Sequence, residues 1–227
     1  MRRWGVIISL FYAMILLVLI VPGAGLLIEE KFSGWSPFLR DLGDSYREWL
    51  LWVPIGILLV SEALLLFLSV DTSQRRLKPR THVLVSCSVA GILTAFLTSG
   101  LVFSLWVAIR GDKVFNLFNP DNTFAAYVLA AWALLWLAWG IVFYFYFRDS
   151  SVVLTSLVSW LLRGSVLDLL IAVPCHVIVR RRHDCSAPLA TGFGIATGVA
   201  IMLLSFGPSV LLLYKKRLDA YATRTSP

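Results

Sequence analysis

Three ionisable side chains lie inside otherwise apolar stretches of the sequence. Glu62 lies in the run Leu58-Leu59-Val60-Ser61-Glu62-Ala63-Leu64, while Arg163 and Asp168 share a later run. A charged group at the centre of a bilayer costs about 2.5–3.5 kcal/mol on insertion scales, so it usually faces the protein interior and finds a partner there. We therefore expect a Glu62–Arg163 pair between two helices.

Two interpretations of these charged residues stay open. In the first, the pair is structural and fixes helix register, or Arg163 extends to the membrane interface instead. In the second, Glu62 or Asp168 is a proton or cation site of a transporter or channel.

A second group of reactive side chains lies between positions 175 and 185, and consists of Cys175, His176, His183 and Cys185. Thiolate and imidazole are ligands that zinc, copper and iron prefer, but this spacing resembles no zinc ribbon or knuckle. Cys175 and Cys185 could instead form a disulfide in an oxidising compartment. No special chemistry, a disulfide and a metal site all stay open. We expect no haem, because only His82 could pair with His176, and the two start from opposite membrane faces.

The same segment contains three consecutive arginines, Arg180, Arg181 and Arg182. Guanidinium groups bind carboxylates and phosphates, so this cluster predicts contact with an acidic partner such as a lipid headgroup or Asp184. We favour an intramolecular partner, the loop between the first two apolar runs. Its acidic residues are Glu29, Glu30, Asp41, Asp44 and Glu48. The aromatic residues of that loop also favour a short amphipathic helix on the membrane surface.

An aromatic stripe runs along one apolar stretch at steps of three and four residues, which places its members on one helical face. The stripe consists of Trp132, Trp136, Trp139, Phe143 and Tyr146. It predicts a docking face for another membrane subunit, or a wall against a flat cofactor. The alternative is packing within the bundle or against lipid. We rank subunit docking first among the functional interpretations, because no ligating residue joins the stripe.

Small residues predict close contacts between helices. Gly194 and Gly198 form a GxxxG pair in the last apolar run, which permits close helix approach. A second small-residue face, at 86–91, lies in the third run, and we expect the two faces to pack together. Gly207-Pro208 should kink the last helix, and such a break could open a transporter-like cavity.

Six long apolar runs must position all of these residues. They span Gly5–Leu27, Trp49–Val70, His82–Ile109, Thr123–Phe147, Val152–Val179 and Ala190–Tyr214. Each exceeds the roughly 20 residues that a helix needs to cross the hydrocarbon core, and backbone groups in lipid must be satisfied within the segment. The chain of 227 residues is 59% hydrophobic and only 15% charged. We predict an all-α, polytopic transmembrane bundle forming one domain over residues 1–227.

The basic residues predict how this bundle is oriented. Arg2 and Arg3 precede the first run, which is longer than the core of a signal peptide, so we expect it to stay as a transmembrane helix. The positive-inside rule then favours cytoplasmic termini. The fifth run is long enough to be read as one tilted helix kinked at Pro174, or as an interfacial helix followed by a re-entrant segment. We favour the single helix.

The motifs that the sequence contains and lacks indicate which classes of function to expect. The sequence has no HExxH, GxSxG or P-loop motif, so we do not expect an enzyme, and we predict no cofactor. The net charge of +7 is explained by lipid headgroups and topology, without nucleic acid. We expect a non-catalytic multi-pass protein of the bacterial inner (plasma) membrane, in contact with membrane lipid. It would act through helix contacts, as a subunit or scaffold or by self-association. The alternative is a small transporter or channel using the intramembrane charges, and a weaker alternative is a metal or redox site.

Overall fold

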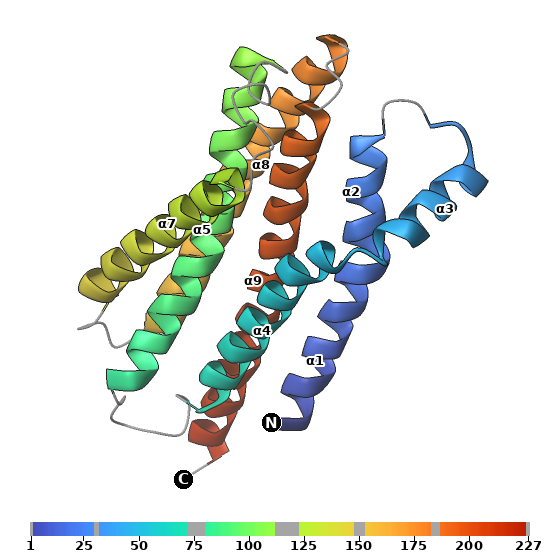
Figure 1. Cartoon of the computed structure of the whole chain (residues 1–227). Coiled ribbons are helices and arrows are strands. Elements are labelled where there is room, and N and C mark those ends of the chain that lie inside the picture. Colours follow the sequence, from blue (N-terminus) through green and yellow to red (C-terminus); the bar gives the residue numbers. More distant parts are fainter. Residues whose placement is uncertain are drawn as a thin grey trace.

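The computed structural model describes residues 2–29, 32–71, 80–111, 123–147, 153–182 and 187–225. The regular secondary structure of these residues is helical, with no strand among them (Figure 1). Within these ranges, six helical segments are long and apolar enough to cross a membrane, which agrees with the predicted all-α class and the six predicted apolar runs. They are Val6–Ile28, Leu51–Leu68, Thr81–Arg110, Leu129–Phe147, Val153–Arg182 and Ala187–Phe206.

The first span is built from three segments that follow one another along one axis. Helix α1 (Arg2–Ile15) continues through the π-helical turn η1 (Leu16–Ile20) into α2 (Val21–Ile28). Pro22 stands at the start of α2 and has no N–H to donate to the preceding turn. The altered hydrogen-bond register of η1 accommodates this loss, as π-bulges inside helices do.

The predicted amphipathic helix of the first loop is present as α3 (Trp35–Ser45). Phe38 is buried and lies against Gly25 of α2, whereas Trp35 and Leu39 are exposed. α3 folds back beside α2 rather than extending the bundle (Figure 1). Its apolar residues therefore both anchor it to the first span and face outward.

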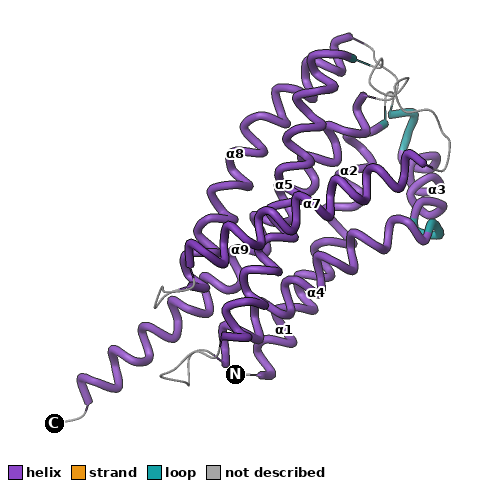
Figure 2. The backbone as a smooth tube through the Cα atoms, turned by 60° about the vertical axis from the view of Figure 1, so that its left-hand side comes forward, coloured by secondary structure: helices purple, strands orange, loops and turns teal. Residues whose placement is uncertain are grey.

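The other spans surround α5 (Arg80–Arg110) and alternate in direction along the chain, so that α8 runs parallel to α5 (Figure 1). α5 packs against α7 (Thr123–Phe147), α8 (Val153–Arg182) and α9 (Ala187–Thr225), while α4 (Trp49–Asp71) contacts α1, α5 and α9. α7 lies on the outside, and most of its surface is exposed. The two termini lie at the same end of the bundle (Figures 1 and 2).

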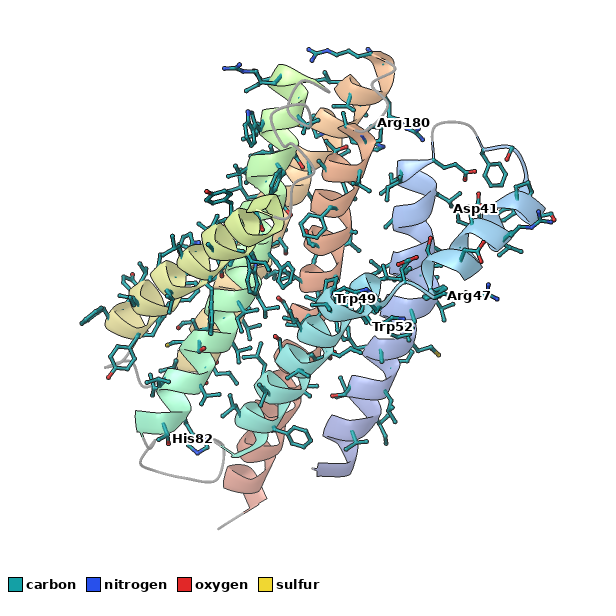
Figure 3. The ribbon with its side chains drawn as sticks, viewed as in Figure 1. Asp41, Arg47, Trp49, Trp52, His82 and Arg180 are labelled. Atoms are coloured by element: carbon teal, nitrogen blue, oxygen red, sulfur yellow. The ribbon has the colours of Figure 1, made fainter. Side chains whose placement is uncertain are left out.

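The fifth span is one continuous helix, which agrees with the single-crossing interpretation. α8 runs from Val153 to Arg182 with Pro174 inside it. At 1.5 Å per residue it is about 45 Å long, longer than a hydrocarbon core of about 30 Å. Its arginine-bearing end therefore lies at the end of the bundle opposite the termini, where Figure 3 shows Arg180.

Candidate functional site

Asp168 lies at the centre of the bundle, on the inward face of α8. Ser165, Asp168 and Ala172 are fully buried and follow one another at helical steps of three and four residues. Neither carboxylate oxygen of Asp168 has a hydrogen-bond partner among the described residues. A buried carboxyl group without a partner carries a large desolvation cost, so its retention needs an explanation.

Three pairs of residues spaced four apart bring the helices together around this carboxyl group. The pairs are Gly100 and Ser104 on α5, Asp168 and Ala172 on α8, and Gly194 and Gly198 on α9; we call these six residues the central seam. Because glycine has no side chain, the backbones can approach until a Cβ added to Gly198 would be 3.0 Å from Asp168 Oδ2, and one added to Gly100 would be 3.7 Å from the same atom.

Two hydroxyl groups, those of Thr197 and Ser104, lie close to glycine positions of the seam. Thr197 Oγ1 is 3.1 Å from the Cβ position of Gly100 and donates to the Phe193 carbonyl oxygen at 2.9 Å. Ser104 Oγ is fully buried and has no partner within the described part of the chain. Neither hydroxyl group forms a hydrogen bond with the Asp168 carboxylate. Protonation is therefore the change that removes the charge of this buried group.

Glu62 is the second buried carboxyl group, and it does not pair with Arg163. Glu62 is 1% exposed on α4, whereas Arg163 is exposed on α8. α4 packs on α1, α5 and α9 instead of lining up with α8. The expected pair is therefore wrong: the two residues lie on helices that are not packed together, and Arg163 faces away from the core.

The arginine cluster does contact the loop that follows the first span, though through the backbone. Arg180 donates to the carbonyl oxygen of Glu29, and Arg182 donates to the carbonyl oxygen of Ala108 at 2.6 Å. Arg181 is exposed. Two of the three guanidinium groups thus cap the ends of neighbouring helices, at the end of the bundle where α2 also ends (Figure 3). This placement agrees with an intramolecular role and leaves a lipid contact for Arg181 open.

The cysteine and histidine group is only partly described. Cys175 is a free, buried thiol, and His176 Nδ1 lies 2.8 Å from Thr191 Oγ1. His183 and Cys185 lie outside the described residues. Within the described ranges, no three His, Cys, Asp or Glu side chains gather as a metal site. Figure 3 places His82 at the end of the bundle opposite Arg180, which follows His176 by one turn, so the two histidines do not face each other.

The aromatic stripe packs inside the chain along most of its length. Trp136 Nε1 donates to the Ser88 carbonyl oxygen at 3.1 Å, and the ring of Trp132 lies 5.2 Å from that of Phe96. Trp139 and Phe143 contact Trp160 of α8, with ring centroids 6.3 and 6.0 Å apart. Tyr146 is the exposed member, at 79%. Four of the five aromatic residues therefore contact α5 or α8, whereas Tyr146 does not contribute to these contacts.

The small-residue faces pack in a different combination from the one predicted. The Gly194–Gly198 face meets Gly100 and Ser104, further along α5 than the 86–91 face. The 86–91 face packs on α7, where a Cβ on Gly91 would lie 2.9 Å from the Gly140 backbone nitrogen. α5 thus has two small-residue faces that pack on different helices. The 86–91 face packs on α7, and the face formed by Gly100 and Ser104 packs on α9.

Three members of the seam, Gly100, Ser104 and Ala172, are not among the residues predicted from the sequence. Gly100 and Ser104 are small residues spaced four apart in an apolar helix, which is the same small-xxx-small signal that identifies Gly194 and Gly198. Ala172 follows Asp168 by one helical turn and lies on the same buried face of α8.

Comparison with known proteins adds no assignment: no protein-family model, curated protein or solved structure matches the chain. The buried carboxyl groups and the helices around them are therefore the features of this protein that bear on its function.

Proposed function

We propose that this multi-pass membrane protein is a small proton-linked transporter, in which Asp168 binds and releases the transported proton. The observation that carries the proposal is the placement of Asp168, fully buried where α5, α8 and α9 meet and without a hydrogen-bond partner among described residues. Intramembrane ionisable groups of this kind commonly mark proton or ion pathways.

The tight packing of the central seam favours a proton over a metal cation. Magnesium and calcium require several oxygen ligands at about 2.0–2.6 Å, and magnesium usually keeps some of its water. Around Asp168 Oδ2, glycine positions of two helices lie within van der Waals contact of the carboxyl group. A proton needs no coordination sphere, so the Asp168 carboxyl group can bind one within this tight packing.

We favour a transport function over a scaffold or subunit role. The stripe that supported subunit docking is largely used within the chain, as the Trp136–Ser88 hydrogen bond and the burial of Phe143 indicate. The remaining exposed apolar faces are those that any lipid-facing helix presents. We place the protein in a bacterial plasma membrane with both termini in the cytoplasm, because the positive-inside bias supports that orientation.

The test is proton movement in proteoliposomes that contain the purified protein. An imposed pH gradient should drive uptake, read from a pH-sensitive dye trapped inside the vesicles. Asp168→Asn keeps the shape of the side chain but cannot lose a proton, so proton movement should be lost. Asp41→Asn makes the same chemical change at an exposed residue of α3 and should retain wild-type movement.

Two results would contradict the proposal. One is wild-type proteoliposomes that pass protons no faster than protein-free vesicles under any imposed gradient or membrane potential. The other is an Asp168→Asn protein that is folded, as judged by its circular dichroism and gel-filtration profile, and moves protons as fast as the wild type.

A further inference from the structure

Glu62 is placed in the interior of a second helix contact, away from the central seam. Leu58 and Leu65, one turn before and after Glu62, both belong to the main buried cluster, so Glu62 points into the same contact. Its carboxyl oxygen Oε2 is buried and has no hydrogen-bond partner in the described part of the protein. α4 therefore holds a carboxyl group inside the bundle at a considerable energetic cost.

Tyr12 of α1 connects this contact with the helix that borders Asp168. Tyr12 is 4% exposed, belongs to the same buried cluster as Leu58 and Leu65, and donates from its hydroxyl group to the Ala200 carbonyl oxygen at 3.1 Å. Ala200 follows Thr197 by one helical turn on α9, in the direction of the C-terminal end. The cluster that contains Tyr12, into which Glu62 points, and the central seam are thus neighbours along α9.

The two carboxyl groups lie at different depths. Glu62 is about 14 Å along α4 from Asp71, at the end of the bundle that carries the termini, whereas Asp168 is about 22 Å along α8 from Val153 at 1.5 Å per residue. Positions along α9 give the same order of depth. The Tyr12 hydroxyl group bonds to Ala200, whereas Asp168 lies against Gly198, two residues further from the C-terminal end of α9. Glu62 is therefore the carboxyl group nearer to the termini.

No described basic side chain neutralises Glu62 from the helices packed on α4. Tyr12 is the titratable side chain that α1 contributes to this cluster, and the buried polar side chains described on α5 and α9 are uncharged serines and threonines. The cluster residues of α5 and α9 themselves are apolar. They are Val89, Leu93, Phe96, Leu97, Ala200, Ile201 and Leu204. Protonation is the change that removes the charge of Glu62 without moving a helix.

From this placement we infer that Glu62 is a second proton-binding group, which exchanges protons with the aqueous face on the side of the termini. A hydronium ion from that face gives its proton to the Glu62 carboxylate, which becomes neutral, and leaves water behind. The inference rests on the proposed transport function, since it makes Glu62 the entry or exit group that precedes or follows Asp168.

Infrared difference spectroscopy of the reconstituted protein tests this inference directly. A carboxyl group that takes up a proton gains a C=O stretching band, and a pH titration should show such bands for Glu62 and Asp168. Glu62→Gln should remove one band and leave the other, and Asp168→Asn should do the reverse. Glu48→Gln, the same change at an exposed residue just before α4, should keep both bands. Glu62→Asp should keep the first band at a shifted frequency.

The outcomes separate this inference from the proposed function. If Glu62→Gln leaves every carboxyl band unchanged over the whole pH range, Glu62 does not titrate and the inference is wrong, while Asp168 can still carry protons. If the Glu62 band is present but Glu62→Gln and Glu62→Asp move protons at the wild-type rate, Glu62 is not on the pathway and the inference is again wrong. Loss of proton movement in Glu62→Gln, with recovery in Glu62→Asp, supports it.

Discussion

Two glycines of the central seam, Gly100 and Gly194, are needed because a methyl group at their positions would meet backbone atoms. A Cβ on Gly100 would lie 3.0 Å from Gly194 Cα, and backbone cannot move aside as a flexible side chain can. We expect Gly100→Ala to lower the free energy of unfolding by about 1–3 kcal/mol, the usual cost of overpacking. Thermal unfolding in detergent, followed by circular dichroism, measures the change.

Gly56 provides the matched control for that substitution. It also lies inside a membrane helix, but nothing lies within 4 Å of its Cβ position. Gly56→Ala should therefore raise stability by about 0.5–1 kcal/mol, because alanine loses less backbone entropy than glycine in a helix. Equal destabilisation by both substitutions would show that the close contact at Gly100 is not what limits stability.

Tyr46 gives a pH dependence outside the membrane-spanning segments. Its hydroxyl group donates to the carbonyl oxygen of Leu17, and burial raises the pKa of Tyr46 above its ordinary value of about 10. The neutral hydroxyl is thus preferred in the folded state, and its stabilising effect is complete below about pH 10. It is lost as the pH rises through the folded-state pKa.

The expected result is a fall in melting temperature above about pH 10 that is smaller in Tyr46→Phe than in the wild type. Below that range, Tyr46→Phe should differ from the wild type by a constant amount, since it lacks the hydrogen bond at every pH. Parallel curves across the alkaline range would mean that Tyr46 ionises equally in the folded and unfolded states.

Residue by residue, the sequence identifies buried charges better than it identifies their partners. Asp168 and Glu62 are recognisable as intramembrane charges from the apolar runs around them, and both are buried. Helix geometry explains why Arg163 does not pair with Glu62. At 100° per residue, Arg163 and Asp168 lie about 140° apart around α8. Only one of them can face the interior, and the apolar pattern around Glu62 says nothing about which helix lies opposite.

In the contact between α5 and α7, the two glycines differ in the direction in which an added Cβ would point. A Cβ on Gly91 would lie 2.9 Å from the Gly140 nitrogen, whereas nothing lies within 4 Å of the Cβ position of Gly140. Gly140 instead borders an apolar groove of about 320 Å³ between the two helices. Gly91→Ala should therefore separate α5 from α7, while Gly140→Ala has room.

The readout for this pair is the distance between α5 and α7, together with stability. Gly91→Ala should lower stability by about 1–3 kcal/mol and weaken a disulfide engineered across the contact, whereas Gly140→Ala should be neutral or stabilising. If both substitutions lower the free energy of unfolding by the same amount, the inferred difference between the Gly91 and Gly140 positions is wrong.

Arg180 ties the first span to the rest of the bundle at the end opposite the termini. Its guanidinium group donates to the Glu29 carbonyl oxygen, just after α2 ends. Arg180→Met keeps the aliphatic stem but removes the donors, so the last turn of α2 should open more often. Hydrogen exchange of the amides at 26–29 should become faster, while Arg181→Met, at an exposed neighbour, should leave it unchanged.

At the scale of helices, hydropathy predicts the spans but not their neighbours. The six spans follow from length and apolarity, because only a helix satisfies its backbone in hydrocarbon. Neighbours are set by how side-chain shapes fit, and helical periodicity identifies a face without saying what covers it. The aromatic stripe and the 86–91 face are both recognisable as contact faces from the sequence, and in the structure each meets the other's helix.

The whole molecule is organised around α5. The two buried carboxyl groups lie on the side of α5 that faces α9, and an apolar contact with α7 lies on another side. Asp168 lies where α8 and α9 meet α5, and Glu62 lies where α4, α1 and α9 meet. A proton pathway through both would run beside α9 from the end with the termini toward the end with Arg180. Its direction across the membrane thus depends on the orientation of the bundle.

That orientation is testable with single cysteines and a membrane-impermeant maleimide on intact cells. The native Cys87 and Cys175 are buried, and replacing Cys185 by serine removes the third. Ser36→Cys, at an exposed position of α3, should be labelled from outside, and a cysteine appended after Pro227 should react only after the cells are opened. The reason is the positive-inside bias, which places Arg2, Arg3 and the basic residues near the C-terminus in the cytoplasm. The reverse labelling pattern would invert the bundle, and Glu62 would then exchange protons with the outside.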